Sequence, residues 1–263
     1  MRRLGIFAAT VAVLAISLCA ARPTSVLAAE KLGVVLIHGK EGMPGQMQGL
    51  VTALNAAGYL AERPEMCWSR RRIYDSAYLD CFADIDFTVK KLKAEGATSI
   101  VIAGMSLGGN AAVGYGARHE GMKGIIALAP APAIEFISKL PAIAKSLAEA
   151  QSMIATGRGN DKATFADINT GRPFEVETTA KIYVSFFAPD SPGVLPDNAA
   201  KLKAPLLIVS GQLDPTQRSV PYAFARAPSN GLNWHVTVAS DHRGTPAAAR
   251  DVVLAWLKIL AGQ

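Results

Sequence analysis

The stretch that decides the fold is residues 99–117, SIVIAGMSLGGNAAVGYGA. An apolar, β-branched run over 99–103 leads directly into Gly104-Met105-Ser106-Leu107-Gly108, and small residues with helical composition follow. This is the G-x-S-x-G pattern in a strand-turn-helix context. A residue at the apex of so tight a turn has strained backbone angles, and flanking glycines let the strand and the helix pass closely. The pattern predicts that Ser106 is a nucleophile at the carboxyl end of a strand.

Strand-like and helix-like segments alternate along the rest of the chain. The expected strands cover 33–37, 59–65, 99–103, 123–128, 205–209 and 234–238, and helices are expected over 46–57, 81–95, 110–117 and the last residues. Such alternation implies parallel strands joined by right-handed crossovers. The predicted fold class is therefore α/β, with a doubly wound, mostly parallel sheet of about six strands and helices on both faces.

The alternation weakens in the middle of the chain. A helical stretch over 133–155 is followed by a loop rich in Gly, Asn and Asp and by a run containing three prolines. So long an interruption inside an α/β domain is typical of an insertion over the site or of a lid. We expect a small cap at 131–200, inserted within a single domain that spans 30–263.

A serine hydroxyl needs a base, and the base needs a partner that fixes its tautomer. The chain has four histidines, His38, His119, His235 and His242. His242 directly follows the last expected strand and precedes the last helix, so it is the predicted base. We expect His235 to have a structural role within its strand, His119 to lie in a solvated helix end and His38 to shape a loop.

Asp214 is the predicted acid. It stands beyond the penultimate strand, and loops at the carboxyl ends of parallel strands share one edge of a sheet. Asp241 is a weaker candidate because neighbouring side chains tend to diverge, and Asp190 and Asp197 are expected to cap turns. The resulting order of serine, acid and histidine along the chain is the one associated with the G-x-S-x-G turn, which is known as the nucleophile elbow.

Acyl transfer develops an oxyanion that needs two hydrogen-bond donors. The N–H of Leu107 supplies one by its position. The loop His38-Gly39-Lys40-Glu41-Gly42 offers the other, most simply the N–H of Lys40. Its glycines would let a substrate carbonyl approach the backbone. The alternative is a plain flexible turn in which the Lys40 and Glu41 side chains face solvent.

The distribution of charge excludes one class of partner. Lys and Arg number 27 against 21 Asp and Glu, and they are spread along the chain. A nucleic-acid reader needs a clustered basic stripe, so we expect no nucleic-acid partner. The short run Arg70-Arg71-Arg72 would attract an anionic substrate. A solvated run whose stems cover Trp68 or Tyr74 is the favoured interpretation.

Residues 1–29 have the order of a secretory signal peptide. A positive start precedes an apolar run over 4–21, and small residues follow it, with cleavage expected after Ala28 or Ala29. An uncleaved membrane anchor is the alternative, and bulky Leu18 disfavours a lipoprotein site at the cysteine that follows it. We therefore expect export to the periplasm or the medium. No second apolar run approaches spanning length, so no stable membrane insertion is expected after cleavage.

Two cysteines, Cys67 and Cys81, lie beyond the signal peptide. An even number in a compartment that permits oxidation favours a disulfide bond between them. Two buried free thiols are the alternative. A metal site is disfavoured because no nearby His or third Cys completes a ligand set.

Together these patterns resemble the α/β-hydrolases of the serine-nucleophile kind over roughly residues 31–263. The stretches that carry the resemblance are the strand with His38-Gly39, 104–108, 205–214 and 241–244. The family implies a parallel-rich sheet with a cap after the strand that follows the elbow. The compact dienelactone-hydrolase-like members, which also lack two preceding antiparallel strands, carry Cys where this chain has Ser106. Members with Asp there are dehalogenases, so that chemistry is disfavoured.

These observations predict an exported serine hydrolase, monomeric or weakly oligomeric, that cleaves a small ester, thioester or amide through an acyl-enzyme, with esters favoured. His242 would remove the Ser106 proton, Asp214 would orient His242, and no cofactor or metal is expected. Two alternatives stay open. One is a binding protein that retained the fold without the reaction, and the other is acyl transfer to an acceptor other than water.

Overall fold

The computed structural model describes residues 30–262. Its main sheet has six strands in the order β2-β1-β3-β4-β7-β8, and every neighbouring pair is parallel. The strands are β1 (Leu32–Ile37), β2 (Leu60–Glu62), β3 (Ser99–Met105), β4 (Gly124–Leu128), β7 (Leu206–Gly211) and β8 (Trp234–Val238). The predicted parallel α/β sheet of about six strands is confirmed. The predicted signal peptide and its cleavage after Ala28 or Ala29 lie outside the described residues.

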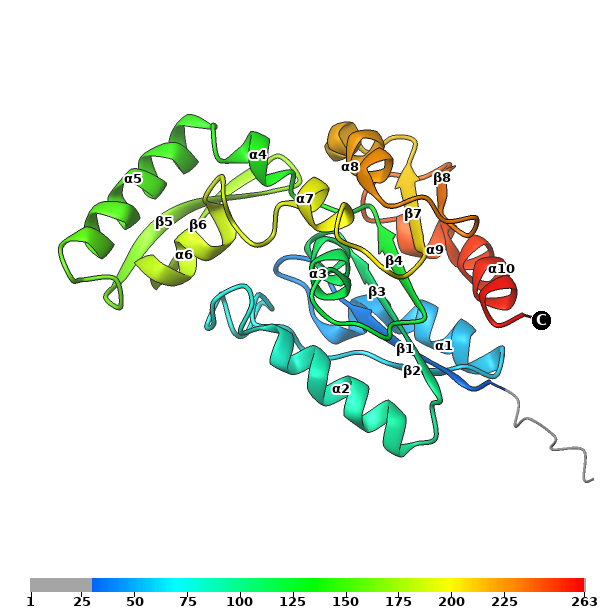
Figure 1. Ribbon diagram of the computed structural model, residues 1–263. Helices are drawn as coiled ribbons and strands as arrows, with labels where there is room; N and C mark the ends of the chain where they lie inside the picture. Colours follow the sequence, from blue (N-terminus) through cyan, green and yellow to red (C-terminus); the bar gives the residue numbers. More distant parts are fainter. Residues whose placement is uncertain (1–29, 263) are drawn as a thin grey trace, which may run out of the picture.

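Successive strand residues pack on opposite faces of the sheet, as the twofold period of a strand requires. In β1, Val34 and Leu36 share one apolar cluster with the helices of one face, while Val35 and Ile37 belong to the cluster of the other face. The first face has α1 (Gln48–Ala56), α9 (Thr245–Ala248) and α10 (Arg250–Leu260), and the second has α2 (Phe82–Ala94), α3 (Leu107–Gly116), α7 (Leu195–Ala199) and α8 (Val220–Arg226) (Figure 1). Because both faces are covered, the central strands β1, β3, β4 and β7 are almost fully buried, whereas the edge strands β2 and β8 are partly exposed.

The chain between β4 and β7 forms a lobe beside the sheet (Figure 1). The lobe contains α4 (Ile134–Ile137), α5 (Pro141–Ala155), β5 (Lys162–Asn169), β6 (Arg172–Thr179) and α6 (Ala180–Phe187). Strands β5 and β6 pair antiparallel, and Thr170 and Gly171 between them have φ of 51° and 81°. Two positive φ angles are typical of the tight turn whose twist suits a hairpin.

The sequence prediction is incomplete within this lobe. The helical stretch expected over 133–155 is two helices, because Pro141 begins the second one at a position that needs no N–H donor. The hairpin β5–β6 is absent from the prediction. Residues 174–178 of β6, Phe-Glu-Val-Glu-Thr, alternate as a half-buried strand does, and the prediction missed this signal. The pattern of β5 is weaker, because the buried residue that follows Phe165 at a spacing of two is the charged Asp167.

Elsewhere the observed bounds differ from the predicted ones by a few residues. The strand expected over 59–65 is limited to Leu60–Glu62 at the edge of the sheet. The helix expected over 46–57 begins with a single 3-10 turn, Pro44–Met47, before α1 starts. These differences leave the order and direction of the six strands unchanged.

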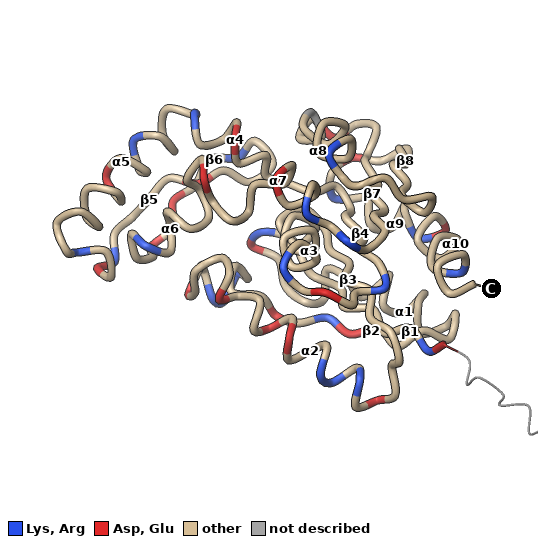
Figure 2. The backbone as a smooth tube through the Cα atoms, in the orientation of Figure 1, with Lys and Arg blue, Asp and Glu red and all other residues tan. Residues whose placement is uncertain are grey.

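The distribution of charge and the length of the apolar helices are both predicted from the sequence. Lys and Arg are interspersed with Asp and Glu over the helices, strands and loops (Figure 2). Across residues 30–262, every helix is too short or too polar to span a bilayer.

Candidate active site

Ser106 lies at the tight turn between β3 and α3. Its backbone has φ 56° and ψ −121°, a conformation that residues with side chains rarely adopt. A Cβ added to Gly104 would lie 2.1 Å from the carbonyl oxygen of Gly108, and one added to Gly108 would lie 2.4 Å from that of Ile37. Both positions therefore require glycine, and the turn presents Ser106 at the carboxyl end of β3.

The side chains of Ser106, His242 and Asp214 form one hydrogen-bonded chain. Nε2 of His242 lies 2.9 Å from Oγ of Ser106, and Nδ1 lies 2.6 Å from Oδ2 of Asp214. Asp214 follows β7 and His242 follows β8, so loops after three parallel strands meet at one edge of the sheet. The structure thus brings together the three side chains that the sequence nominates as nucleophile, base and acid.

Several donors hold the Asp214 carboxylate in place. Its Oδ1 accepts from the backbone N–H and the hydroxyl of Thr216 at 2.9 and 2.7 Å, and its Oδ2 accepts from Nε2 of Gln217 at 3.0 Å. Burial raises the pKa of Asp214, but hydrogen bonds from His242 and Thr216 outweigh it and lower the pKa below its usual value. Asp214 is therefore ionised at neutral pH and can stabilise a protonated His242.

The other acidic candidates lie apart from this chain of hydrogen bonds. Asp241 accepts from the backbone N–H of Gly244 at 2.7 Å and shapes the loop between β8 and α9. Asp197 is in the first turn of α7, and Asp190 lies exposed in a turn. Residues 30–262 contain no cluster of three His, Cys, Asp or Glu side chains suited to a metal ion.

The other three histidines also have positions away from Ser106 Oγ. His38 is buried in the loop after β1, where its Nε2 accepts from the N–H of Met66 at 3.0 Å and its Nδ1 lies 2.8 Å from the carbonyl oxygen of Gly39. Burial lowers the pKa of His38. His235 lies within β8 and His119 follows α3. His38 therefore fixes the loop that precedes Lys40.

Two backbone N–H groups beside Ser106 are available to a ligand. Leu107 is the first residue of α3, so its N–H has no acceptor within the helix. The N–H of Lys40 donates to no other group in the described part of the chain. The loop passes so close to the elbow that a Cβ on Gly39 would lie 3.1 Å from the Cβ of Ser106. These are the two donors that the sequence suggests for an oxyanion.

The side chain of Lys40 points into the protein, contrary to the solvent-facing alternative. Its Nζ lies 2.5 Å from Oδ1 of Asp167 and 3.0 Å from the carbonyl oxygen of Ile168, and the two charged side chains are 4% and 0% exposed. The hydroxyl of Tyr74 donates to the other oxygen of Asp167 at 2.9 Å. The prediction from the sequence misses this ion pair because Asp167 is 127 residues away from Lys40. Asp167 also lies in the segment where the alternation of strands and helices is weakest.

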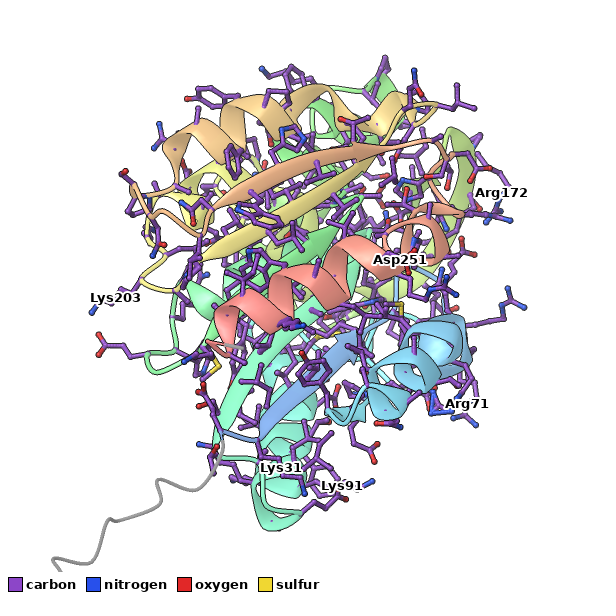
Figure 3. All side chains as sticks on the ribbon, turned by 90° about the vertical axis from the view of Figure 1, so that its right-hand side faces the viewer. Lys31, Arg71, Lys91, Arg172, Lys203 and Asp251 are labelled. Carbon is purple, nitrogen blue, oxygen red and sulfur yellow. A yellow bond between two sulfur atoms is a disulfide. The ribbon has the colours of Figure 1, made fainter. Side chains whose placement is uncertain are left out.

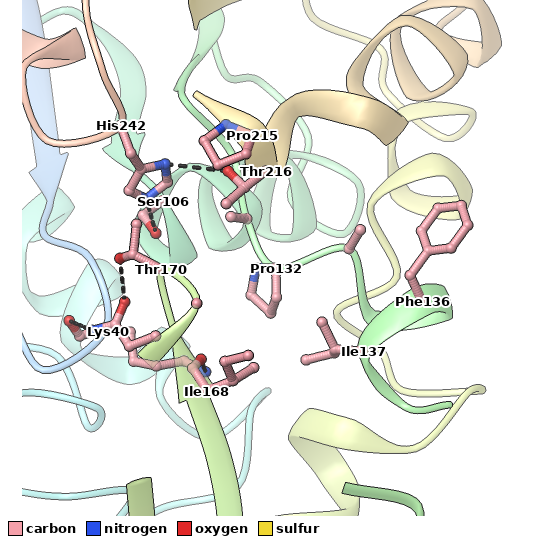
Figure 4. Close-up of a pocket in the computed structure, with 14 residues that line it drawn as sticks. Lys40, Ser106, Pro132, Phe136, Ile137, Ile168, Thr170, Pro215, Thr216 and His242 are labelled. Atoms are coloured by element: carbon pink, nitrogen blue, oxygen red, sulfur yellow. Dashed lines mark hydrogen bonds between the residues drawn. The ribbon is translucent and has the colours of Figure 1, made fainter. Parts of the chain in front are cut away.

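Two cavities meet at Ser106 and His242. The first has a volume of about 320 Å³ and lies between α4, the β5–β6 turn and the loop after β7 (Figure 4). We term it the apolar cavity, after the side chains of Ala131, Pro132, Ala133, Phe136, Ile137, Ile168 and Pro215. The second has a volume of about 490 Å³. We term it the basic cavity; its charged and amide side chains are Lys40, Glu41, Gln46, Arg70, Asn169, Arg172 and Arg243.

A disulfide bond joins Cys67 and Cys81, whose Cα atoms are 5.6 Å apart. The loop that it closes packs against the loop after β1. Nε1 of Trp68 donates to the carbonyl oxygen of His38 at 3.1 Å, and the N–H of Arg70 donates to that of Gly42 at 3.1 Å. The bond therefore supports one wall of the site from outside the sheet.

Comparisons with known proteins place the chain among hydrolases. The family model described as serine aminopeptidase, S33, matches residues 28–181, more than half of the chain. The match includes Ser106 and the loop after β1 and ends before Asp214 and His242. No curated protein matches the chain.

Several solved structures have the same fold at low sequence identity. A structure of the metagenome-derived lipolytic enzymes LipS and LipT is 20% identical over 89% of this chain and 95% of that chain, with a TM-score of 0.58. The monoacylglycerol lipase of Paleococcus ferrophilus is 18% identical over 88% and 94%, with a TM-score of 0.62. Est1E from Butyrivibrio proteoclasticus is 20% identical over 89% and 90%, with a TM-score of 0.60.

Proposed function

Because the chain belongs to the serine aminopeptidase S33 family of α/β-hydrolases, we propose that it hydrolyses a small carboxylic ester through an acyl-enzyme on Ser106. The resemblance to α/β-hydrolases that the sequence indicates is confirmed by the family match and the shared fold. The observation that carries the proposal is the hydrogen-bonded chain from Ser106 through His242 to Asp214. Thioesters and amides would react by the same steps.

In the first half-reaction, Oγ of Ser106 attacks the carbonyl carbon of the ester while Nε2 of His242 takes its proton. Asp214 accepts the Nδ1–H of the ring and stabilises the imidazolium. The bond to the leaving oxygen then breaks, and His242 gives its proton to that oxygen. The products are a free alcohol and an acyl group on Ser106.

The intermediate of this step carries a negative charge on the former carbonyl oxygen. The N–H groups of Leu107 and Lys40 would donate to it, and the amino terminus of α3 adds a favourable field. Loss of one such donor typically costs about 3 kcal/mol of transition-state stabilisation. The hydrogen bonds within the loop after β1 hold the second donor: Gly42 N–H donates to Gly39 O at 3.0 Å, and Gly39 N–H donates to Oε1 of Gln46 at 2.9 Å.

In the second half-reaction, a water molecule replaces the alcohol. His242 takes a proton from the water as its oxygen attacks the acyl carbon, and the bond to Ser106 breaks as His242 returns the proton to Oγ. The carboxylic acid leaves and the side chains return to their starting protonation states. No other reactant is consumed.

The charges around the site favour an ester over the amino terminus of a peptide. A protonated α-amino group that enters a cavity needs a carboxylate to pair with it. The one carboxylate that lines either cavity is Glu41, and its Oε2 already accepts from Arg172 at 2.6 Å and from Asn169 at 2.9 Å. We therefore propose an ester as the substrate, rather than the peptide amino terminus that the words serine aminopeptidase in the family description would suggest.

A nucleophile test checks the proposal. We expect a fluorophosphonate probe to label the wild type and p-nitrophenyl esters of short acids to be cleaved. Ser106→Ala should abolish labelling and lower kcat by roughly a millionfold, the loss expected when a triad serine is removed. Ser152→Ala, at an exposed position of α5 that lines neither cavity, is the matched control. Labelling or undiminished turnover in Ser106→Ala would overturn the proposal.

We also propose that the protein acts outside the cytoplasm after loss of residues 1–29. The disulfide between Cys67 and Cys81 supports this, because such bonds persist in oxidising compartments. Intact-mass measurement of the protein recovered from the periplasm or the medium should give the chain beginning after Ala28 or Ala29. A mass that includes the amino-terminal segment would contradict cleavage.

A further inference from the structure

The two cavities that meet at Ser106 differ in charge. The apolar cavity has one charged lining residue besides His242, Lys40, which is paired with Asp167. The basic cavity adds three arginines and Glu41 to its lining. A substrate that spans both cavities therefore meets an apolar wall on one side of Ser106 and a positive wall on the other.

Internal ion pairs neutralise only part of this positive wall. Arg172 pairs with Glu41. Arg70 and Arg243 form no ion pair with any residue of 30–262, and both are exposed. Two guanidinium groups thus face the basic cavity without a compensating carboxylate. Guanidinium groups bind carboxylates and phosphates through charge-assisted hydrogen bonds, and a cleft of one sign raises the local concentration of opposite charge.

The neighbours of Arg70 show that this placement is specific to one residue of the run. Arg71 pairs with Glu65 and lowers the pKa of that carboxyl to about 2. Arg71 is 69% exposed and projects from the surface (Figure 3). Arg72 pairs with Asp75 at 2.7 Å and with a carboxylate of α2. Only Arg70 of the three lines the cavity.

We propose that the substrate is an ester whose alcohol portion carries a negative charge, bound with its acyl group in the apolar cavity and its anionic alcohol in the basic cavity. This inference rests on the proposed function and names the substrate class of the same site. Arg70 and Arg243 are the residues that select the anion.

The order of events favours this orientation over the reverse one. The acyl group is transferred to Ser106 in the first half-reaction and stays in place until water attacks it, so its chain can remain against the apolar wall. The alcohol must leave and be replaced by water, which a polar cavity admits. Arg243 directly follows His242 in the chain and lines only the basic cavity. The proton donor to the leaving oxygen thus lies next to one of the anion-binding residues.

Three esters of matched shape test the placement of the charge. The first joins butyrate to 3-hydroxybenzoate and has an anionic leaving group. The second joins butyrate to 3-hydroxybenzamide and is neutral. The third joins succinate to 3-hydroxybenzamide and carries its charge on the acyl side. We expect the wild type to have the highest kcat/KM for the first ester and the lowest for the third.

The ratio of kcat/KM for two esters is then compared between the wild type and arginine variants. The intrinsic reactivity of each ester cancels in that comparison. The ratio of kcat/KM for the first ester to that for the second should fall roughly fivefold in Arg70→Gln and in Arg243→Gln, the upper range for an exposed charge pair. It should fall roughly twenty-five-fold in the double variant if the two free-energy effects add. Arg71→Gln is the matched control and should keep the wild-type ratio. Added salt should lower the wild-type ratio, because it shortens the Debye length.

The outcomes separate this inference from the proposed function. Cleavage of all three esters with equal ratios in wild type and variants overturns the inference and leaves the hydrolase intact. A preference for the succinate ester also overturns it, because the charge would then belong on the acyl side. If the wild type cleaves none of the esters and takes up no fluorophosphonate, the proposed function fails and the inference falls with it.

Discussion

The six-stranded sheet and the lobe of α4, α5, β5, β6 and α6 contribute to the site in different ways. The sheet supplies Ser106, Asp214 and His242 from loops after three of its strands. The lobe supplies cavity walls from α4 and the β5–β6 turn, and one buried link, Asp167 to Lys40. We therefore expect the chemistry and the choice of acyl group to depend on different parts of the protein. Changes in the triad should affect esters of all acyl chain lengths alike, and changes in the lobe should alter the ranking of acyl chain lengths.

After the loss of the nucleophile itself, the largest effect is expected from Asp214, the acid that follows β7. Asp214→Asn keeps the shape of the side chain but can no longer stabilise the cation of His242, so kcat should fall about ten-thousandfold. The loss should be equal for esters of short and longer acids. Steady-state kinetics on p-nitrophenyl acetate, butyrate and octanoate measure it. A loss of kcat that depends on the length of the acyl chain would contradict the expectation that Asp214 acts on all esters alike.

The sheet and the triad were predictable because their signals are local. Each of the four central strands is an apolar run covered on both faces. The tight turn at Ser106 requires glycine at 104 and 108, and both glycines are visible in the sequence. Asp214 and His242 follow from their places after the last two strands. The lobe gave a weaker signal, because only β6 of its hairpin alternates between apolar and charged residues, and β5 buries the charged Asp167 beside the apolar Phe165.

Asp167 illustrates why the rest was not predictable. It is an acidic residue in a segment of mixed polarity, and its partner Lys40 lies 127 residues earlier in the chain. The pairing arises only when the lobe folds over the loop after β1. Arg70 is similar, since no local pattern distinguishes it from Arg71 and Arg72. Long-range packing, rather than propensity, decides which of these charges meets the site.

The buried ion pair between Lys40 and Asp167 joins the lobe to the loop after β1, and its removal should have the next largest effect. Asp167→Asn leaves Lys40 charged and buried without its counter-ion, which typically costs 3 to 5 kcal/mol, so we expect a loss of about 3 kcal/mol in the free energy of unfolding. Lys40→Met combined with Asp167→Asn removes both charges and should recover most of that loss. Urea unfolding measures both variants. An equal loss in the double variant would mean that the ion pair is not what couples the regions.

The disulfide should stabilise the sheet side of the site by a similar amount. Cys67 and Cys81 are 14 positions apart, and closing a loop of that length is worth about 3 kcal/mol in the chain-entropy model. We expect Cys67→Ala with Cys81→Ala to lower the free energy of unfolding by this amount while leaving the ranking of acyl chain lengths unchanged. An altered ranking would show that this loop, like the lobe, affects the selectivity for the acyl group.

A wall residue of the lobe should have a smaller and more selective effect. Ile137→Ala enlarges the apolar cavity, and each additional buried methylene of the acyl chain then contributes about 0.8 kcal/mol. The preferred p-nitrophenyl ester should become longer by roughly one to three methylene groups. Leu140→Ala, which follows α4 and does not line the cavity, is the matched control. A uniform loss of rate at all chain lengths would contradict the assignment of this wall to selectivity.

The smallest expected effect concerns His38, which holds the loop between the two regions. Burial lowers the pKa of His38, so the unfolded chain, with a histidine pKa of about 6.5, takes up a proton that the folded protein excludes. The stability that His38 contributes is therefore complete above about pH 6.5 and is lost as the pH falls through that value toward the lower pKa of the folded state. The urea midpoint of the wild type should be lower at about pH 5.5 than at about pH 7.5. His38→Asn should reduce this difference, whereas His119→Asn, at the end of α3, should retain it. Burial also lowers the pKa of His235 in β8, so part of the difference should remain in His38→Asn. A difference that is undiminished in His38→Asn would contradict the contribution of His38.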